Sequence, residues 1–287
     1  MALIAVTGAA GFLGRQVVAE LTAGGHGVRA LDSVRGDFEP SVDARTVDLR
    51  DADATREALR GVDGIVHLAG FPRAGSHSPD EVFTTNTAIT FAVVQAALDL
   101  GVPTLAYVSS VSVIGYPFFT QPIVPESLPI DESATTTPQD AYGLSKAVGE
   151  QIIDAAVAQA GGGLAAVSLR MPWLQSPESF WRDIPASRPD GSDARNLFAY
   201  LDTRDAASAI AAVFDAPLAG HLRLFVAAAD TFDERPSEEI ALEYFTAVPL
   251  RRALKGTESL IDTARARTAL DWAPRYSWRE YPREEQR

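Results

Sequence analysis

The sequence predicts an α/β fold in which helices cover both faces of a doubly wound parallel sheet. Short apolar segments alternate with longer segments whose apolar residues recur at helical spacing, a pattern typical of parallel βαβ units. A glycine-rich turn follows the first strand, and hydroxyl side chains follow a later one, where parallel strands would end at one edge. We therefore expect a Rossmann-type sheet over residues 1–170. Residues 171–287 should form a smaller C-terminal region, with some elements returning to the first domain.

The chain starts with a predicted buried strand, Leu3–Val6, and a predicted helix, Phe12–Leu21. Glycines at positions 8, 11 and 14 allow a tight turn, close backbone approach to a pyrophosphate, and close packing of helix on strand. The helix N-terminus offers free N–H groups to phosphates. A glycine-rich turn without a ligand is the plainer alternative. The residues expected to contact a dinucleotide here are Gly8, Gly11, Phe12, Leu13 and Gly14.

A second predicted strand, Val28–Leu31, ends at Asp32. A carboxylate at this distance from the glycine turn accepts hydrogen bonds from ribose hydroxyls and repels a 2′-phosphate, which favours NAD as the cofactor. Arg35 could instead accommodate that phosphate. A short third strand is predicted over Val47–Leu49, which would place Asp48 and Leu49 near the adenine. The alternative role for Asp48 is an exposed cap of a helix over Asp51–Leu59.

Two further strands are predicted, Asp63–Leu68 and Thr104–Val108, with a long helix, Pro79–Leu100, between them. Leu68, Ala69 and Gly70 end the first of these strands, and the small residues would let a cofactor pass close to the backbone. The long helix carries Asn86 in an apolar setting, which we also assign to the cofactor site. Serines at positions 109, 110 and 112 follow the second strand and should point into the ligand crevice, although they could simply form a turn.

Tyr142 and Lys146 lie four residues apart in a predicted helix over Gln139–Ala160, so their side chains should share one helix face. The chain has only two lysines, so lysine at this position is notable. A neighbouring ammonium favours the ionised phenol and should lower the pKa of Tyr142. Tyr142 is therefore a candidate general acid/base, with Lys146 as its electrostatic partner. A solvated helical pair is the alternative.

The composition argues against several classes of function. A net charge of −13 is unfavourable for a nucleic-acid or anionic-membrane surface. The absence of cysteine excludes disulfides and thiol nucleophiles, and the 4 histidines are not at metal-ligand spacing, so no metal site is expected. The apolar start, Met1–Val6, is too short for a signal or membrane anchor, which leads us to expect a cytoplasmic enzyme.

Taken in order, these residues resemble the extended short-chain dehydrogenase/reductase family, especially its NAD-dependent epimerase/dehydratase branch. The matching motifs, which cover at least residues 3–170, are Thr7–Gly14, Asp32, His67–Gly70, Asn86, Ser109-Ser110 and Tyr142-x-x-x-Lys146. The resemblance implies NAD as cofactor and Tyr142 as acid/base. It also implies that Ser110 hydrogen-bonds the reacting oxygen, that Lys146 binds the nicotinamide ribose, and that Asn86 matches a family helix position.

Two segments depart from the family pattern. The family's sugar-nucleotide 4,6-dehydratases carry an acidic pair after a threonine where this chain has Ser110-Val111, which argues against dehydration by that route. The last strand of the cofactor domain, Ala165–Arg170, leads into Met171–Leu174 instead of the family's usual Asn-x-Tyr-Gly-Pro. The substrate pocket is therefore expected to be unusual.

The remaining segments should build that pocket. Gly115–Ala141 and Ser176–Asn196 are proline-rich and aromatic, and we interpret them as pocket-covering loops. The second carries Arg182, Arg188 and Arg195, which could hold a phosphate or carboxylate or could simply be solvated. The predicted later elements are a helix from Asp205 to Phe214, a strand over Leu222–Ala227, helices over Pro236–Tyr244 and Ser259–Leu270, and a frayed end over Arg279–Arg287.

The predicted function is hydride transfer between a nicotinamide and a hydroxyl-bearing carbon of a small sugar or sugar derivative. Whether the enzyme is an epimerase or a dehydrogenase stays open, and a non-catalytic dinucleotide-binding sensor or interaction protein is the alternative. We also expect a homodimer built on two helices with apolar faces. The face residues are Phe91, Val94, Ala97 and Leu98 in one helix, and Val148, Ile152, Ala155 and Ala156 in the other.

Overall fold

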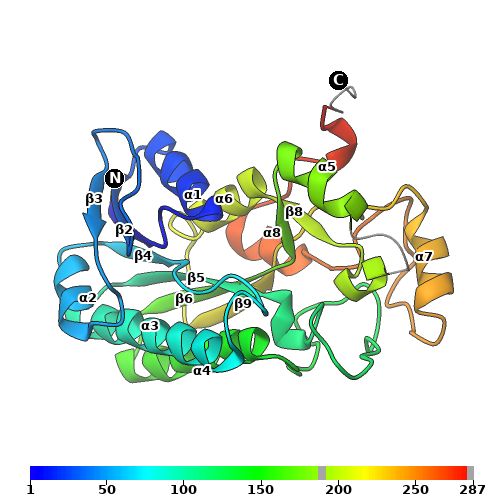
Figure 1. Cartoon of the computed structure of the whole chain (residues 1–287), viewed down its shortest axis with the longest axis horizontal. Coiled ribbons are helices and arrows are strands. Elements are labelled where there is room, and N and C mark those ends of the chain that lie inside the picture. Colours follow the sequence, from blue (N-terminus) through cyan, green and yellow to red (C-terminus); the bar gives the residue numbers. More distant parts are fainter. Residues whose placement is uncertain (187–191, 283–287) are drawn as a thin grey trace.

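The computed structural model describes residues 1–186 and 192–282, and it contains the expected doubly wound sheet (Figure 1). Seven parallel strands lie in the order β3-β2-β1-β4-β5-β6-β9. Their bounds are β1 Leu3–Thr7, β2 Gly27–Asp32, β3 Asp43–Thr46, β4 Gly64–His67, β5 Thr104–Ser110, β6 Ala165–Met171 and β9 His221–Phe225. The strand order reverses between β1 and β4, so a crevice is expected beyond the carboxyl ends of these strands.

The third strand is β3, Asp43–Thr46, and the prediction of a strand over Val47–Leu49 was wrong. β3 is the edge strand and pairs only with β2, in the register Arg29↔Asp43 to Asp32↔Thr46. Most of its side chains are exposed, so its sequence has no apolar pattern to mark it. Val47 and Leu49 are apolar because they pack beyond the strand end, at the cavity described below.

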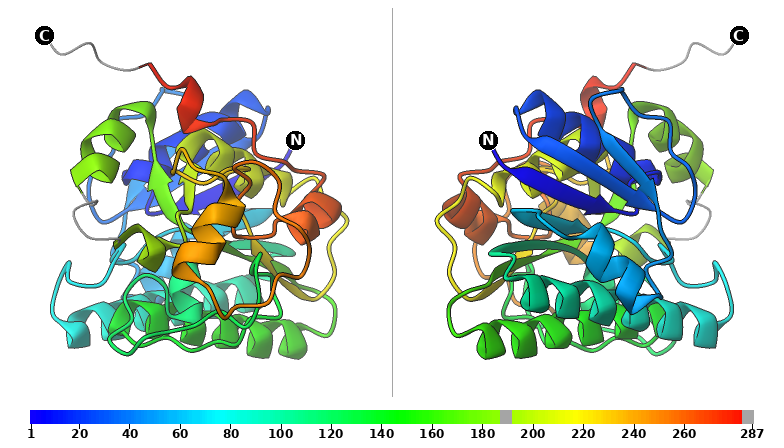
Figure 2. Two further views of the ribbon diagram at one scale, coloured as in Figure 1. Left: turned by 90° about the vertical axis from the view of Figure 1, so that its right-hand side faces the viewer. Right: turned by 90° about the vertical axis from the view of Figure 1, so that its left-hand side faces the viewer.

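Helices cover both faces of the sheet, as the turned views in Figure 2 also show. α1 (Phe12–Ala23), α6 (Thr203–Ala212) and α8 (Ala264–Leu270) share one apolar core with the sheet. α2 (Ala52–Ala58), α3 (Pro79–Leu100) and α4 (Ala141–Ala160) share the core on the opposite face. α3 and α4 lie side by side in both figures. The C-terminal elements β9, α6 and α8 thus complete the layers begun by the N-terminal half.

Side-chain caps fix where the helices on the second face begin. Asp51, and not Asp48, caps α2 by accepting from the backbone N–H groups of Asp53 and Ala54, each at 3.0 Å. Ser78 starts α3 with a reciprocal capping box to Glu81. Asp140 starts α4 by accepting from the N–H groups of Tyr142 at 2.8 Å and Gly143 at 3.0 Å. The cap of α4 thereby sets the position of Tyr142 at its first turn.

The segment predicted as a second loop, Ser176–Asn196, instead contains helix α5 (Pro177–Ala186) and a short 3₁₀ helix (Ser192–Asn196). The hydroxyl of Ser176 accepts from the N–H of Ser179, and Phe180 and Ile184, four residues apart, are both buried. The prediction of a loop was wrong because proline at the first helical position is compatible with a helix. Residues 187–191, which include Arg188, lie outside the described residues.

The last helix is shorter than predicted, since α8 spans Ala264–Leu270 and not Ser259–Leu270. The backbone before it pairs with the loop that precedes α4: Ile130 donates to the carbonyl of Leu260 at 2.8 Å, and Asp262 donates to the carbonyl of Ile130 at 2.7 Å. These backbone groups are therefore unavailable to a helix. A short helix, α7 (Ser237–Tyr244), lies on the outside of this region.

A second, two-stranded parallel sheet, β7 (Trp173–Gln175) with β8 (Tyr200–Asp202), follows β6. It borders an aromatic cluster in which Phe180 stacks on Trp278 with ring centroids 5.2 Å apart. Tyr281 is buried in the same cluster and its hydroxyl donates to Asp202 at 2.5 Å. The prediction of a frayed end over Arg279–Arg287 is therefore wrong for Arg279 to Tyr281. Residues 283–287 lie outside the described part of the chain. Within the described part, no helix has both the length and the apolarity to cross a membrane.

Candidate active site

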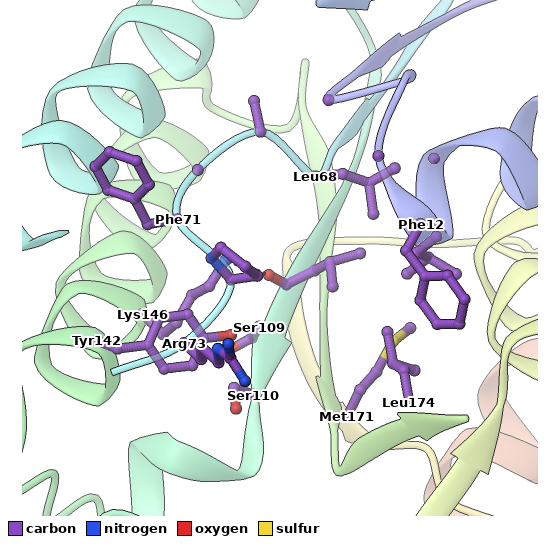
Figure 3. Close-up of a pocket in the computed structure, with 18 of the residues that line it drawn as sticks. Phe12, Leu68, Phe71, Arg73, Ser109, Ser110, Tyr142, Lys146, Met171 and Leu174 are labelled. Atoms are coloured by element: carbon purple, nitrogen blue, oxygen red, sulfur yellow. Dashed lines mark hydrogen bonds between the residues drawn. The ribbon is translucent and has the colours of Figure 1, made fainter. Parts of the chain in front are cut away.

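A cavity of about 970 Å³ lies at the carboxyl edge of the sheet, where β1, β2, β4 and β5 end (Figure 3). Its size lies at the upper end of the roughly 300–1,000 Å³ typical of small-molecule sites. Nearly all the sequence-predicted site residues line it: Gly8, Gly11, Phe12, Leu13, Gly14, Asp32, Asp48, Leu49, Leu68, Ala69, Gly70, Ser110, Tyr142 and Lys146. Asn86 is the exception. The cavity also includes Phe71 and Arg73, which were not assigned to the site from the sequence, and Phe118, Met171 and Trp173, which lie in segments expected to shape the substrate pocket.

The glycine turn at one end of the cavity requires glycine for steric reasons. Gly8 has φ +70°, and a Cβ there would lie 2.9 Å from the backbone nitrogen of Ala69. A Cβ on Gly14 would lie 2.2 Å from the carbonyl oxygen of Gly8. Gly11 is the N-cap of α1 and makes no side-chain cap, and the first-turn residues Phe12, Leu13 and Gly14 line the cavity. This arrangement fits a pyrophosphate at the helix N-terminus.

Asp32 is held at the end of β2 by two backbone groups. Its Oδ2 accepts from the N–H of Ala10 at 2.9 Å, and its Oδ1 accepts from the N–H of Val34 at 3.2 Å. The carboxylate lines the cavity, whereas Arg35 does not. The geometry therefore favours ribose hydroxyls over a 2′-phosphate at this position.

Asp48 also lines the cavity, but it is paired with the neighbouring Arg50. The Arg50 side chain, aided by its backbone N–H, holds the pKa of Asp48 at about 2. Asp48 is therefore ionised at neutral pH, and both acidic residues that line the cavity, Asp32 and Asp48, lie at its glycine-turn end.

Asn86 does not line the cavity and instead holds the segment that does. It is 4% exposed, its Oδ1 accepts from the N–H of Phe71 at 2.7 Å, and its Nδ2 donates to the carbonyl of Phe71 at 3.2 Å. The same amide donates to the hydroxyl of Ser145 at 3.1 Å, which links this segment to α4. A direct contact of Asn86 with a cofactor stays a prediction.

Ser110, Tyr142 and Lys146 are brought together at the other end of the cavity. Ser110 ends β5; its hydroxyl accepts from the N–H of Ser112 at 3.1 Å and donates to the hydroxyl of Ser112 at 3.0 Å, and its proximity lowers the pKa of the Tyr142 phenol. Lys146 is 6% exposed and donates from Nζ to the carbonyl of Val108 at 2.8 Å. Its Nζ lies 5.7 Å from the centroid of the Tyr142 ring. A hydroxyl, a phenol and an ammonium thus meet at one surface of the cavity.

The expected lowering of the Tyr142 pKa was wrong. Burial raises the pKa of Tyr142 to about 12, the hydrogen bond with Ser110 opposes this rise, and the charge of Asp140 adds to it. Burial also lowers the pKa of Lys146 to about 8, against the opposing effect of Glu150. Loss of water therefore outweighs the attraction between a phenolate and an ammonium that is bound to a carbonyl. At neutral pH the phenol is protonated and ready to donate.

Glu150, one turn beyond Lys146, is a buried residue that the sequence analysis missed. Its carboxylate accepts from the Ser109 hydroxyl at 2.7 Å, from Arg170 at 2.7 and 3.0 Å, and from Arg223 at 2.9 Å. Burial tends to raise the pKa of Glu150, but Arg170 and the other partners keep it below its usual value. The signal in the sequence was a third polar residue four positions after Lys146, at the spacing that keeps it on the same helix face.

The arginines proposed for the substrate pocket have protein partners where the structure describes them. Arg182 pairs with Asp183, and Arg195 donates to the carbonyl of Phe119 and stacks on its ring at 4.1 Å. Arg188 lies outside the described residues. In the described part of the chain, no group of three or more His, Asp or Glu residues could hold a metal ion.

Comparison with known proteins gives a family match over most of the chain. The model of the NAD dependent epimerase/dehydratase family matches residues 4–227. A UDP-glucose 4-epimerase of Streptomyces lividans is 34% identical over 174 residues, which is 57% of this chain and 50% of that protein. An L-arabinose 1-dehydrogenase (NAD(P)(+)) of Haloferax volcanii is 34% identical over 179 residues, which is 61% of this chain and 68% of that protein.

Solved structures share the fold at lower identity. A mutated uronate dehydrogenase matches with TM-score 0.70 and 24% identity, covering 97% of this chain and 83% of that one. A UDP-glucose 4-epimerase from Bifidobacterium longum in complex with NAD⁺ and UDP matches with TM-score 0.73 and 20% identity, covering 97% and 95%. The matches to most of the curated relatives span about half of those proteins' length.

The low pKa of Lys146 predicts a measurable effect of pH on stability. The folded-state pKa of about 8 lies below the ordinary 10.5, so between these pH values the unfolded chain binds a proton that folded Lys146 lacks. The free energy of unfolding therefore rises with pH across this window, by up to about 1.4 kcal/mol per pH unit. Denaturant unfolding at pH 8 to 10.5 should show that Lys146→Met removes this rise. The matched control is the exposed Lys255→Met, which should keep it; a parallel pH curve for Lys146→Met would contradict the assignment.

Proposed function

The chain belongs to the NAD dependent epimerase/dehydratase family, and we propose that it is an NAD-dependent oxidoreductase acting on a sugar or sugar derivative. The reaction transfers hydride between the nicotinamide and a hydroxyl-bearing carbon. The observation that carries the proposal is the meeting of Ser110, Tyr142 and Lys146 at the cavity end opposite the glycine turn.

The residues around the cavity fit NAD. The first turn of α1 and the glycine turn would hold the pyrophosphate, Asp32 would accept from the ribose hydroxyls, and Lys146, which lines the same cavity, would bind the nicotinamide ribose. NAD supplies the hydride acceptor, and as NADH the hydride donor. Because no acidic pair follows Ser110, the proposal covers oxidation and reduction and leaves out dehydration.

Tyr142 moves the proton and Ser110 orients the reacting oxygen. In the reducing direction the protonated phenol gives its proton to the substrate oxygen, and in the oxidising direction the phenolate takes the hydroxyl proton. The Ser110 hydroxyl, which donates to the Ser112 hydroxyl at 3.0 Å in the structure, would turn to donate to the same oxygen. The ammonium of Lys146 stabilises the phenolate, and the protonated form of Lys146 declines as the pH passes about 8.

Both an epimerase and a dehydrogenase fit this site, because the two reactions share the oxidation step. The relatives include both epimerases and dehydrogenases. We favour a small sugar substrate. Purified protein that reduces added NAD with free sugars or uronic acids supports a dehydrogenase, whereas cofactor that co-purifies and stays bound supports an epimerase. A sensor without activity, the alternative, would bind NAD without either property.

We propose that residues 171–287 mainly bind the substrate, while β9, α6 and α8 complete the cofactor domain. Support comes from the segment after β6, where Met171, Trp173 and Leu174 line the cavity. From the loop before α4, Pro117 and Phe118 line it too, and the Phe118 ring meets Tyr142 edge to face at 6.3 Å. The cytoplasmic location stays a prediction, which cell fractionation would test.

Tyr142→Phe should retain NAD binding and lose roughly 10²–10⁴-fold in kcat, because only the proton-transferring hydroxyl is removed. Calorimetry measures the binding, and NADH absorbance measures the turnover. Ser110→Ala should slow turnover by less. Tyr276→Phe, at an exposed tyrosine outside the cavity, serves as the control and should leave turnover unchanged. Near-wild-type turnover by Tyr142→Phe would remove Tyr142 from the mechanism.

Asp32→Asn should narrow a wild-type preference for NAD over NADP. The amide keeps an acceptor for the Ala10 N–H but loses the charge that strengthens hydrogen bonds from the ribose and repels a 2′-phosphate. Hydrogen bonds to charged groups contribute about 1.5–3 kcal/mol, so NAD affinity should fall by roughly tenfold or more. Calorimetric Kd values for both cofactors decide this. A wild-type preference for NADP that Arg35→Gln abolishes would instead assign the cofactor choice to Arg35.

We also propose that the protein is a homodimer through the outer faces of α3 and α4. Val94, Ala97 and Ala156, expected on these faces, instead pack in the protomer's own core. The outer surface nevertheless keeps large apolar side chains, since Phe91 is 57% exposed and Leu144 is 45% exposed. Exposed apolar residues on adjacent helices are typical of an isologous interface.

Light scattering at micromolar concentration should give a mass of twice 30.7 kDa. The double variant Phe91→Glu/Leu144→Glu should give the monomer mass, because it places like charges in the interface. The control is Leu242→Glu, at a leucine on α7 that is 66% exposed, which should leave the dimer intact. A wild-type mass near 30.7 kDa would rule the dimer out.

A further inference from the structure

The substrate end of the cavity contains an arginine that the proposed reaction does not use. Arg73 follows β4 and lines the cavity together with Ser110 and Tyr142. In Figure 3 its guanidinium extends toward Ser109 and Ser110, on the same side of the cavity as the Tyr142 ring. We propose that Arg73 determines substrate specificity by binding an anionic group, a carboxylate or a phosphate, of the sugar. This inference rests on the proposed function, because it places the sugar at that end.

The backbone on both sides of Arg73 is held in place. Phe71 is fixed by two hydrogen bonds to the buried Asn86, and its ring stacks on His77 with centroids 3.7 Å apart. The carbonyl of Arg73 itself accepts from the hydroxyl of Ser76 at 2.9 Å. The Arg73 side chain therefore extends into the cavity from an anchored segment, which reduces the entropy lost when it binds a ligand.

The guanidinium of Arg73 has no hydrogen-bond or ion-pair partner among the described residues. Thirteen other arginines in the described part of the chain pair with carboxylates: Arg29, Arg45, Arg50, Arg56, Arg60, Arg170, Arg182, Arg204, Arg223, Arg235, Arg251, Arg252 and Arg279. In the described cavity lining the acidic residues are Asp32 and Asp48, both at the glycine-turn end. The cavity thus has its acidic groups at one end and an uncompensated positive charge at the other.

This charge arrangement suits a sugar that carries a negative group. The whole chain has a net charge of −13, which repels anionic ligands, so a local cation is needed for one to enter the cavity. The planar guanidinium binds carboxylate or phosphate oxygens through two parallel N–H donors. A neutral sugar would leave Arg73 solvated and would gain nothing from its charge.

Binding to the protein saturated with NADH tests the proposal without relying on turnover. Calorimetry would compare D-glucuronate, D-glucose 1-phosphate and D-glucose with the wild type, Arg73→Gln and Arg73→Lys. The matched control is Arg267→Gln on α8, which removes the same charge from an exposed arginine that does not line the cavity. Because charge-assisted hydrogen bonds contribute about 1.5–3 kcal/mol, Arg73→Gln should weaken anion binding about tenfold or more. Arg73→Lys should restore part of it, and D-glucose binding should not change.

The two anions distinguish the source of the charge. A preference for glucuronate that depends on Arg73 indicates a sugar acid, and the same result with glucose 1-phosphate indicates a sugar phosphate. The proposal is overturned if neither anion binds more tightly than glucose, or if Arg267→Gln weakens anion binding as much as Arg73→Gln does.

Failure of the two proposals can be told apart. Arg73-dependent anion binding without NAD reduction or epimerisation of any sugar would overturn the proposed function and leave the anion site standing. Turnover that is lost in Tyr142→Phe but shows no preference for anionic sugars would overturn the anion site and leave the proposed function standing.

Discussion

The buried carboxylate of Glu150 fixes the helix on which the site depends. It joins α4 to three strands, through Ser109 on β5, Arg170 on β6 and Arg223 on β9. Both Glu150 and Arg170 are 3% exposed, and a buried ion pair gains little net stability but is costly to break. Its effect is on position: any rotation or slide of α4 would leave charges unpaired. Tyr142 and Lys146, at intervals of one turn on the same face, are held in register with the end of β5.

Burial then sets the protonation states of the site. The environment that positions Tyr142 also removes water from it, so the phenol holds its proton at neutral pH, while the ammonium of Lys146 becomes easier to deprotonate. The cap residue Asp140 raises the phenol pKa further and fixes the first turn of α4. The positions and the protonation states of Tyr142 and Lys146 therefore result from the same packing. The same two side chains in water would have neither.

The cavity combines three kinds of surface along its length. Uncapped N–H groups and glycines lie at one end beside the carboxylates of Asp32 and Asp48, and the proton-transferring groups lie further along. Arg73 and the aromatic side chains of Phe118 and Trp173 surround the remaining space. The first set follows β1, β2 and β3, whereas Ser110 ends β5, Arg73 follows β4, Tyr142 and Lys146 come from α4, and Trp173 is on β7. The pyrophosphate of NAD at the glycine turn and a negative group of the sugar at Arg73 would together match this distribution of charge.

The amino-acid sequence by itself determined the fold class, the order of the main strands and helices, and most residues that line the cavity. Periodicity, glycine spacing and strand ends are local properties, and parallel strands necessarily bring their carboxyl ends together. The sequence pattern missed β3 because an edge strand can be polar, and missed α5 because its proline resembled a loop signal. Tertiary structure alone decided the pKa of Tyr142, the partners of Glu150 and the absence of a partner for the Arg73 guanidinium among the described residues. Each of these depends on how much water is excluded and on which groups from other elements approach, such as Ser109, Arg170 and Arg223 at Glu150.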